Sequence, residues 1–383
     1  NKIKNHKLYL MKKYKLLYFV SEDEYFLSHK IFQAKDALKN KFDVMVICNF
    51  TKYENKIKSE GFKTQNIHFD RRSINPLTNL NYLIRLLKII RTFKPNIIQC
   101  FALKPILLTS IAAFFNKNIK VLCCVVGVGS LVINNNFFSN FIRGFYFFLL
   151  KTFTMSNISY VFQNLDDVKL FKKKGVIKNK NVKIIKGSGV DTNFFKKSKN
   201  KKIYDLIFHS RILKDKGIIE IIDALKKLQK KKIILSTLIL GNPDPKNFSS
   251  ISVEKLNNWN ESKIIIWKPK VEDVLPYLQK SRIAILPSYR EGLPKSLLEA
   301  ASCELPIIST NVPGCREICL DKFNGFLVKP NDSKSLAKAI EKLVFNQELM
   351  DKFGKNGRSH VIKNFANELV SKKFSEVYQS LLK

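Results

Sequence analysis

Short apolar runs alternate with longer segments of helical periodicity along most of this chain, and this alternation limits the fold more than any other feature. It is typical of parallel strands joined by crossover helices, which cover both faces of the sheet. The predicted strands are Lys15–Val20, Asp43–Cys48, Ile97–Phe101, Val121–Val126, Ile158–Phe162, Val182–Lys186, Leu206–His209, Leu235–Leu240, Lys263–Trp267, Ile283–Leu286 and Pro306–Ser309. The predicted helices include Ser28–Leu38, Asn79–Arg91, Lys334–Phe345 and Glu368–Leu382. The sequence therefore predicts an α/β protein.

The chain is long enough for two domains. Its 383 residues can supply two hydrophobic cores of ordinary size. A polar, lysine-rich segment, Lys196–Lys202, separates two series of predicted strands. We therefore predict one Rossmann-like domain over residues 1–196 and a second over residues 197–367, followed by a C-terminal helix in residues 368–383. Ligands of such open sheets gather at the carboxyl ends of the strands.

The segment Ser288–Glu317 carries the strongest functional signal. Glu291 and Glu299 lie eight positions apart across a Gly-Leu-Pro turn that opens a helix. The spacing places Glu291 on the loop and Glu299 about two turns down the helix on the same side. The N–H groups of the helix start between them form an anion site. Such a site could hold a nucleotide sugar, although a loop followed by an ordinary amphipathic helix has the same pattern.

This segment resembles a known family. Glu-x7-Glu, with Gly-Leu-Pro-Lys-Ser-Leu-Leu-Glu-Ala and Val-Pro-Gly-Cys-Arg-Glu, is similar to the retaining glycosyltransferases of family 4. The nearest subgroup is the bacterial enzymes that extend lipid-linked diphosphosugars in O-antigens, capsules and protein glycans. The resemblance implies the GT-B fold, in which two Rossmann-like domains face a central cleft and the last helix packs back on the N-terminal domain.

The resemblance also implies a donor site in the second domain. Arg211 and Lys216, in a motif that runs from His209 to Gly217, follow a strand and open a helix. By themselves they are as typical of a surface loop, but in the family the matching residues bind the donor diphosphate. Glu291 would hold the hydroxyls of the donor sugar and Glu299 those of the ribose. The remaining predicted donor-binding residues are Gly292, Leu293, Lys295, Ser296, Gly241 and Lys268.

Two other segments are weaker indications of a functional site. Trp267-Lys-Pro-Lys departs from the usual Leu-Gly, so Trp267 is either a base-stacking residue or a buried strand residue. The turn Gly187-Ser-Gly-Val-Asp191 matches a family turn, and we expect its role to be mostly structural because glycine allows unusual backbone angles.

Candidate acceptor or cleft residues lie in the first domain. They follow predicted strands or begin helices, and they are His29, Lys104, Gly127, Gly129 and Ser130. Lys104 and the two glycines resemble the lipid-acceptor subgroup, whereas His29 is equally consistent with capping or packing. The chain departs from the family in lacking a glycine-rich loop after its first strand. It also has Cys100 and Phe101 where many members have a histidine.

The formal net charge of +37 is extreme and unevenly distributed. Residues 71–165 contain no acidic residue, and residues 134–155 are rich in phenylalanine. Codon bias accounts for part of the lysine content but not for the uneven distribution. A basic, phenylalanine-rich helix suits an anionic membrane surface, although burial between domains is equally consistent. We therefore expect a cytoplasmic protein that is peripheral on the inner face of the cell membrane and has no specific nucleic-acid partner.

Two further features bear on location and cofactors. No apolar run reaches the length of a membrane-spanning helix. The polar N-terminal segment does not resemble a signal peptide, and we expect Met11 to be a more natural first residue than Asn1. The seven cysteines have no metal-ligand spacing, so we predict buried thiols in a reducing compartment. No Asp-x-Asp motif follows a strand, and we predict neither a cofactor nor a required metal.

Together these features predict a retaining hexosyltransferase. A hexose or N-acetylhexosamine would pass from a UDP-sugar to a polyprenyl-diphosphate-linked sugar, with Glu291, Arg211 and Lys216 as catalytic residues. The resemblance implies front-face transfer, in which the departing phosphate oxygen helps to deprotonate the acceptor hydroxyl. The alternatives are a UDP-sugar 2-epimerase with the same fold, a polyanion-binding module, or an inactive scaffold. The epimerase is disfavoured because residues 71–165 also contain no histidine, and the scaffold because Arg211, Lys216 and both glutamates are intact.

Overall fold

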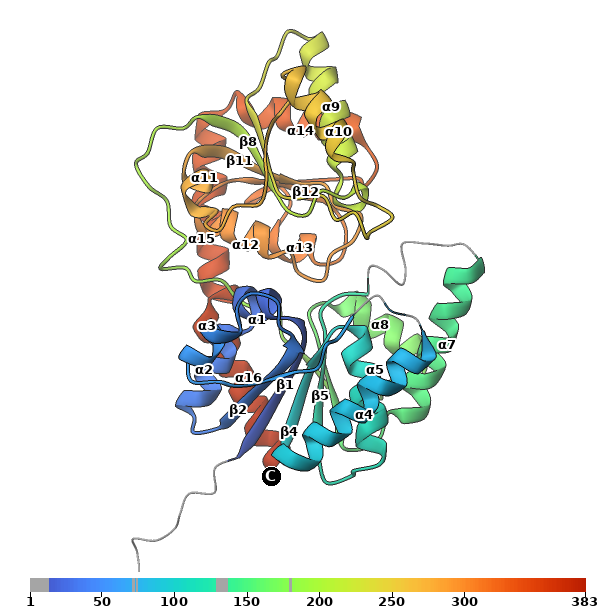
Figure 1. The fold of residues 1–383 in the computed structure, drawn as a ribbon. Helices are drawn as coiled ribbons and strands as arrows, with labels where there is room; N and C mark the ends of the chain where they lie inside the picture. The colour runs from blue at the N-terminus through green and yellow to red at the C-terminus, as the bar shows by residue number, and fades with distance from the viewer. Residues whose placement is uncertain (1–13, 71–72, 74, 129–136, 179–180) are drawn as a thin grey trace, which may run out of the picture. The chain divides into compact units, whose positions relative to one another are not determined.

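A computed structural model describes residues 14–70, 73, 75–128, 137–178 and 181–383, and it divides the chain into two compact units (Figure 1). The first unit contains the described residues up to Val126, those between Phe137 and Ile185, and Ser371–Lys383. The second contains Lys186–Val370 together with Gly127 and Val128. Gly129 and Ser130 lie outside the described residues.

The first unit is built on a seven-stranded parallel sheet in the order β3-β2-β1-β4-β5-β6-β7. Its strands are β1 (Lys15–Glu22), β2 (Asp43–Asn49), β3 (Lys63–Asn66), β4 (Ile97–Phe101), β5 (Lys120–Val125), β6 (Ile158–Phe162) and β7 (Val182–Ile184). Every residue of the central strand β4 is buried, as expected for a strand that is covered on both faces.

Helices cover both faces of this sheet (Figure 1). They are α1 (Asp23–His29), α2 (Ile31–Lys39), α3 (Glu54–Ser59), α4 (Pro76–Phe93), α5 (Leu103–Phe114), α7 (Phe137–Phe153) and α8 (Leu165–Lys173). Crossovers toward β3 and crossovers toward β7 place their helices on opposite faces, because parallel connections are right-handed. On one face α4 packs on α5, and α5 packs on α7.

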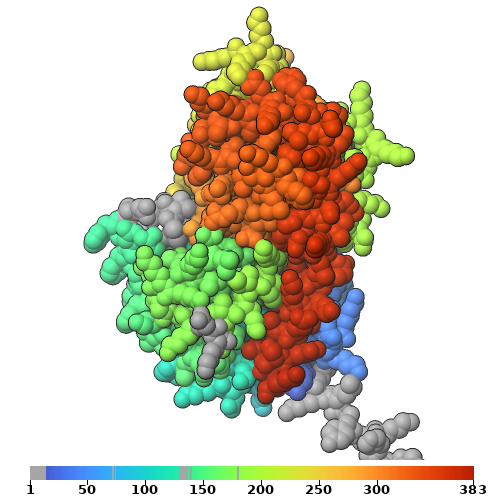
Figure 2. All heavy atoms as spheres, turned by 180° about the vertical axis from the view of Figure 1, so that it is seen from behind, coloured from blue at the N-terminus to red at the C-terminus, as the bar shows by residue number. Residues whose placement is uncertain are grey.

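The C-terminal helix α16 (Asn367–Leu382) packs on the first unit over its last three turns. The Tyr378 hydroxyl lies 2.8 Å from the Tyr18 hydroxyl. It accepts a hydrogen bond from the side-chain amide of Gln33 at 3.2 Å and donates one to the side-chain amide oxygen of Gln99. The Ser375 hydroxyl donates to Asp36 at 2.5 Å. Seen from behind, the red end of this helix lies beside the green segment that contains β7 (Figure 2).

The second unit is built on a six-stranded parallel sheet in the order β10-β9-β8-β11-β12-β13. Its strands are β8 (Tyr204–His209), β9 (Thr237–Leu240), β10 (Ile266–Lys268), β11 (Ser281–Leu286), β12 (Ile307–Thr310) and β13 (Gly325–Val328). Its helices are α9 (Ile218–Lys230), α10 (Val253–Glu261), α11 (Leu275–Gln279), α12 (Lys295–Ser302), α13 (Cys315–Ile318), α14 (Ser333–Val344) and α15 (Gln347–Phe365). The apolar faces of α9, α12 and α14 pack on the sheet and form one hydrophobic core with it.

The sequence-based elements differ from the structure in a few places. The predicted helix Ser28–Leu38 corresponds to α2, but it begins too early, because another helix, α1, ends at His29 and Lys30, with a φ of −123°, separates the two. The predicted strand Lys263–Trp267 is displaced to Ile266–Lys268. The edge strands β3 and β13 were not predicted, and for β3 the reason is that its residues are polar and half exposed.

Two findings concern membrane spanning and the thiols. Within the described ranges, no helix is both long enough and apolar enough to cross a bilayer. All seven cysteines are buried and unbonded, which confirms their prediction as buried thiols.

Candidate active site

The carboxyl ends of β8 and β11 lie side by side in the second unit, at the point where the strand order reverses. β8 pairs in parallel with β11, and the chain continues from β8 toward β10 and from β11 toward β13. Loops that follow two such strands diverge and bind ligands between them. Arg211 and Lys216 follow β8, and Glu291 and Glu299 follow β11. The topology therefore gathers four predicted site residues at one edge of one sheet.

Two glycines hold the loop that carries Glu291. Gly217, at the start of α9, has a φ of +80°, and a Cβ there would lie 2.2 Å from the carbonyl oxygen of Pro287. Gly314 also has a φ of +80°, and its Cβ would lie 2.7 Å from the carbonyl oxygen of Glu291. Residues with a side chain rarely adopt this backbone conformation, and neither position has space for a Cβ atom. Glycine is therefore required here for both conformation and packing.

Lys216 and Glu291 form a close ion pair. The Lys216 Nζ lies 2.5 Å from the Glu291 Oε1, and both side chains are mostly buried. Lys216 ends the short 3₁₀ turn Lys214–Lys216 that follows β8. The residues are 75 positions apart in sequence, so the sheet rather than local structure brings them together. An ammonium group has three N–H donors, and two remain for a further acceptor after this contact.

Glu299 is held by a histidine and a lysine. The His209 Nε2 lies 3.3 Å from the Glu299 Oε2, and the Lys295 Nζ lies 3.3 Å from the Glu299 Oε1. Burial by itself would raise the pKa of Glu299, but the hydrogen bond from His209 and the charge of Lys295 outweigh it and hold this pKa below its ordinary value. Glu299 is therefore ionised at neutral pH although it is almost completely buried.

Glu299 lies closer to the start of its helix than the spacing predicts. α12 begins at Lys295, after the N-cap Pro294, so Glu299 is about one turn into the helix rather than two. The Gly-Leu-Pro segment remains non-helical, which delays the helix start. Ser296 is in the first turn of α12, and Leu293 packs against Gly187, whose Cβ would lie 2.3 Å from a Leu293 methyl group.

Arg211, Gly241 and Lys268 lie at neighbouring strand ends. Arg211 is half exposed, and its guanidinium lies 3.4 Å from the carboxylate of Asp244. Gly241 follows β9 with a φ of +146°, and a Cβ there would lie 1.9 Å from the carbonyl oxygen of Ser210. Lys268 ends β10, and its carbonyl oxygen accepts from the Gly241 N–H at 3.1 Å. The donor-binding role predicted for these residues stays a prediction, although the sheet brings their strand ends together.

Trp267 is anchored to this edge of the sheet. Its indole N–H donates to the carbonyl oxygen of Gly241 at 3.1 Å, and the side chain is partly buried. The backbone turn that begins at Gly187 has structural contacts, since the Val190 N–H donates to the carbonyl oxygen of Phe365 at 2.9 Å.

Two predicted acceptor residues, His29 and Lys104, lie in the first unit near the carboxyl ends of β1 and β4. The His29 ring stacks on Tyr25 with centroids 4.6 Å apart, and its Nδ1 lies 2.7 Å from the Ser28 hydroxyl. The Lys104 ammonium donates to the carbonyl oxygens of Asp70 and Ser73 at 2.8 and 2.6 Å. Burial lowers the pKa of Lys104, with the Asp70 charge opposing this shift.

Gly127 also belongs to this predicted acceptor group. It follows β5 and has a φ of +134°, a value that favours glycine. The predictions for Gly129 and Ser130 concern residues outside those that the structure describes.

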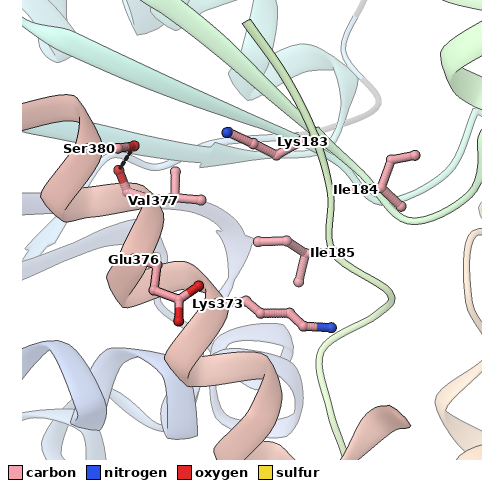
Figure 3. Close-up of a pocket in the computed structure, with 7 residues that line it drawn as sticks. All are labelled: Lys183, Ile184, Ile185, Lys373, Glu376, Val377 and Ser380. Carbon is pink, nitrogen blue, oxygen red and sulfur yellow. Dashed lines mark hydrogen bonds between the residues drawn. The ribbon is translucent and has the colours of Figure 1, made fainter.

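A separate pocket of about 220 Å³ lies between β7 and α16 (Figure 3). Its lining comes from the strand end and from one side of the helix, and consists of Lys183, Ile184, Ile185, Lys373, Glu376, Val377 and Ser380. None of these seven residues belongs to the predicted site. Over the described residues, no three histidine, cysteine or carboxylate side chains are grouped so as to hold a metal ion.

Three residues with contacts at strand ends were missed by sequence reasoning. His209 was noted only as the first residue of its motif, although its position at the end of a central strand is a signal for a site residue. Asp244 pairs with Arg211 across neighbouring strand ends. Asp23 accepts the backbone N–H groups of Lys52 and Tyr53 at 2.9 and 2.8 Å and so joins the ends of β1 and β2. These pairings depend on strand order, which local sequence does not contain.

Comparison with protein families and solved structures agrees with this architecture. Residues 15–162 match the family model described as "Glycosyl transferase 4-like", and residues 189–360 match "Glycosyl transferases group 1". A glycosyltransferase from Rickettsia africae has a TM-score of 0.76 at 20% identity and covers 97% of this chain and 99% of its own. The HepE protein of Anabaena, solved with UDP and glucose, has a TM-score of 0.77 at 14% identity and covers 96% of this chain and 100% of its own.

The two parallel sheets and these structural neighbours show the GT-B fold, which confirms the predicted fold class. The chain belongs to the glycosyltransferases whose N-terminal part is of the 4-like type and whose C-terminal part is of group 1. One relative, 26% identical over 91% of this chain and 94% of its own length, is the N,N'-diacetylbacillosaminyl-diphospho-undecaprenol alpha-1,3-N-acetylgalactosaminyltransferase of Campylobacter jejuni. Another, 26% identical over 82% of this chain and 84% of its own length, is the capsular polysaccharide biosynthesis glycosyltransferase CapM of Staphylococcus aureus.

Proposed function

We propose that this glycosyltransferase retains anomeric configuration and moves a hexose or N-acetylhexosamine from a UDP-sugar to a lipid-diphosphate-linked sugar. The observation that carries this proposal is the contact of two mostly buried carboxylates with basic side chains at the carboxyl ends of β8 and β11. Glu291 contacts Lys216, and Glu299 contacts His209 and Lys295. A nucleotide sugar complements this arrangement, because its hydroxyls donate to carboxylates and its diphosphate accepts from cations.

Each of these groups has a proposed partner on the donor. Glu291 accepts hydrogen bonds from the sugar hydroxyls, and Glu299 accepts them from the ribose. Lys216 and Arg211 donate to the diphosphate with the N–H groups that Glu291 and Asp244 do not occupy. The carboxylates position the two cations before the donor binds, so little ordering is required on binding.

In the proposed step, the bond between the anomeric carbon and the diphosphate oxygen breaks while the acceptor oxygen bonds to the same face of that carbon. The acceptor hydroxyl loses its proton to the departing phosphate oxygen. Arg211 and Lys216 stabilise the negative charge that develops on this leaving group, which is the usual role of fixed cations in such steps. We propose that these residues supply this charge without a required metal.

The acceptor part of the proposal rests on relatives and on charge. The Campylobacter jejuni relative is named for a diphospho-undecaprenol acceptor, and the acid-free stretch of residues 71–165 favours approach to an anionic membrane. We therefore propose a protein that works peripherally at the inner face of the cell membrane. His29, Lys104, Gly127, Gly129 and Ser130 remain the proposed acceptor contacts.

Donor binding is tested first by thermal unfolding of the purified chain with UDP-, GDP- and ADP-sugars. A donor at 100 times its Kd should stabilise the fold by about 2.7 kcal/mol. We expect this stabilisation with UDP-sugars, and we expect it to be lost in Glu299→Ala and Arg211→Ala. The control is Arg282→Ala, which removes an arginine at the start of β11 that pairs with Asp205 in β8, and it should keep the stabilisation. No shift with any nucleotide sugar would contradict the proposal.

Transfer is tested with a radiolabelled UDP-sugar and a short-chain lipid diphosphosugar. We expect the label in the lipid product, with unchanged anomeric configuration and a rate that EDTA does not lower. Arg211→Ala should slow transfer on the order of 10²-fold, the usual cost of removing one charge-stabilising donor. Product of inverted configuration, or label released only as free sugar, would exclude the proposed reaction.

A further inference from the structure

The outer face of α7 carries a stripe of exposed phenylalanines that the described part of the chain does not cover. Phe137, Phe141, Phe145 and Phe148 are 89%, 65%, 55% and 63% exposed. Their spacing of four, four and three residues places them on one side of the helix. At 1.5 Å per residue the stripe is about 16 Å long. Solvent-exposed apolar surface of this kind marks an interaction site.

The opposite face of α7 already forms the contacts that hold the helix in the fold. The Phe147 ring lies 5.3 Å from that of Phe171 in α8, and the Tyr146 hydroxyl donates to the carbonyl oxygen of Leu103 at 2.9 Å. Leu150 is completely buried. The exposed stripe is therefore additional to what the first unit needs for its own core.

Charge identifies the partner. The helices α4, α5 and α7, which pack in one layer, contain no aspartate or glutamate, whereas they contain three lysines and three arginines. A protein partner with an ordinary mixed surface does not require this exclusion of acids. An anionic lipid surface does, because each nearby Lys or Arg strengthens binding to the lipid headgroups and each acidic side chain weakens it.

The helix α4 repeats the arrangement of α7. Leu77, Leu80 and Ile84 are exposed in its first half, and Lys88 and Arg91 are exposed at positions that continue the same side. On α7, exposed Lys151 follows the phenylalanine stripe in the same way. Both helices follow a strand, so both begin at the carboxyl edge of the sheet, the edge where the acceptor residues are predicted. On each helix apolar groups come first and cations follow.

We propose that α7 lies in the plane of an anionic bilayer surface, with Phe137, Phe141, Phe145 and Phe148 inserted between the lipids and with α4 alongside it as a second contact. This surface deepens the proposed function and rests on it for one point, the lipid-linked nature of the acceptor. It would place the start of α7, which follows β5 at the carboxyl edge of the first sheet, against the lipid headgroups, where the diphosphate of a lipid-linked sugar lies. Binding combines buried phenyl area with attraction between cations and headgroups.

Vesicle flotation of the full chain tests the proposal. We expect binding to vesicles of phosphatidylcholine with about one third phosphatidylglycerol, little binding to phosphatidylcholine alone, and weaker binding as salt rises from about 0.05 to 0.5 M. The double variant Phe141→Ser, Phe145→Ser should bind at least tenfold more weakly. The matched control is Phe248→Ser, Phe345→Ser, which removes two phenylalanines that are 72% and 70% exposed in the second unit, and it should bind as the unchanged protein does.

Equal loss in both double variants, equal binding by the α7 variant, or no preference for anionic vesicles would overturn the proposal. A second measurement uses Phe145→Trp, whose emission should shift to shorter wavelength with anionic vesicles and be quenched by lipids brominated in their acyl chains. An unshifted and unquenched emission would likewise overturn it.

Donor-dependent thermal stabilisation separates this proposal from the proposed function. The α7 double variant should keep the stabilisation by UDP-sugars, because its substitutions lie outside the second unit. Vesicle binding that depends on Phe141 and Phe145 in a protein that binds no nucleotide sugar would uphold the surface and reject the transferase site. The reverse result would uphold the site and reject the surface.

Discussion

At the scale of single residues, Glu299 combines two properties that are rarely found together. It is almost completely buried, and its pKa lies below the ordinary value because His209 and Lys295 contact its two oxygens. A buried carboxylate without such partners would be neutral. The site therefore keeps an acceptor-only group ready for hydroxyl donors at neutral pH.

The substitution Glu299→Gln keeps the shape of this side chain and removes its charge. At pH 7 we expect the free energy of unfolding to fall by about 1.5–3 kcal/mol, the usual contribution of a hydrogen bond to a charged group. The lowered pKa stabilises the fold at pH values above that of an unfolded glutamate, about 4.3, and this contribution disappears as pH falls through the folded pKa. Urea unfolding across pH should therefore show a difference between the two proteins that shrinks below about pH 4.

Lys295→Gln is the matched control for that experiment, because it removes one cation and leaves the carboxylate. At pH 7 we expect Lys295→Gln to lower the free energy of unfolding by less than Glu299→Gln does, because His209 still contacts Glu299. A difference between the unchanged protein and Glu299→Gln that stayed constant down to the acid limit of folding would show that the charge of Glu299 does not stabilise the fold.

At the scale of elements, the site depends on the backbone where α9 begins. Gly217→Ala forces a side chain into a left-handed conformation, which costs about 1–2 kcal/mol, and brings its Cβ against the Pro287 carbonyl. We expect a loss of at least about 2 kcal/mol in unfolding free energy and weaker UDP-sugar binding, because the neighbouring Lys216 moves with this backbone. Chemical unfolding and titration calorimetry measure the two effects.

The matched control for this prediction is Gly144→Ala in α7. A Cβ at Gly144 would meet no atom within 4 Å, and the helical backbone accepts it. The same change should therefore stabilise the protein by up to about 1 kcal/mol, since alanine is the better helix former. If both variants lost the same stability, the conformational argument for Gly217 would be wrong.

Sequence predicts the central strands well and the edges poorly. Strands such as Ile97–Phe101 are buried on both faces and therefore appear as continuous apolar runs, whereas edge strands such as Lys63–Asn66 need only one covered side and have polar sequences. The roles predicted for the site residues rest on family resemblance. Their pairing could not be predicted, because the partners of Lys216 and Arg211 lie on other strands and depend on strand order.

At the scale of the whole molecule, the first unit is completed by the end of the chain. Tyr378 in α16 contacts Tyr18, Gln33 and Gln99 in a buried polar network. Burial is the largest effect on the Tyr378 hydroxyl and raises its pKa far above the ordinary value, so this group remains protonated throughout the physiological range. The network fixes the rotation of α16 against the sheet, because an apolar contact alone is not directional.

Tyr378→Phe should lower the free energy of unfolding by about 1–3 kcal/mol, because it leaves buried partners of the hydroxyl unsatisfied. Tyr14→Phe, at a residue that is 37% exposed, is the matched control and should change stability by less than about 0.5 kcal/mol. Urea unfolding measures both. Equal stabilities for the two variants would mean that the network around Tyr378 contributes nothing to the attachment of α16.

The 360 positions between Tyr18 and Tyr378 have a consequence for synthesis. A ribosome makes the strands of the first unit before the second unit, but it makes helix α16, which packs on those strands, after the second unit. Until α16 is made, the hydroxyl of Tyr18 and the side-chain amides of Gln33 and Gln99 lack their partner Tyr378, whereas the residues of the second unit up to Val370 have already been translated. The unit whose strands are translated first is therefore completed only after the second unit has been made, and translation of α16 is the event that completes it.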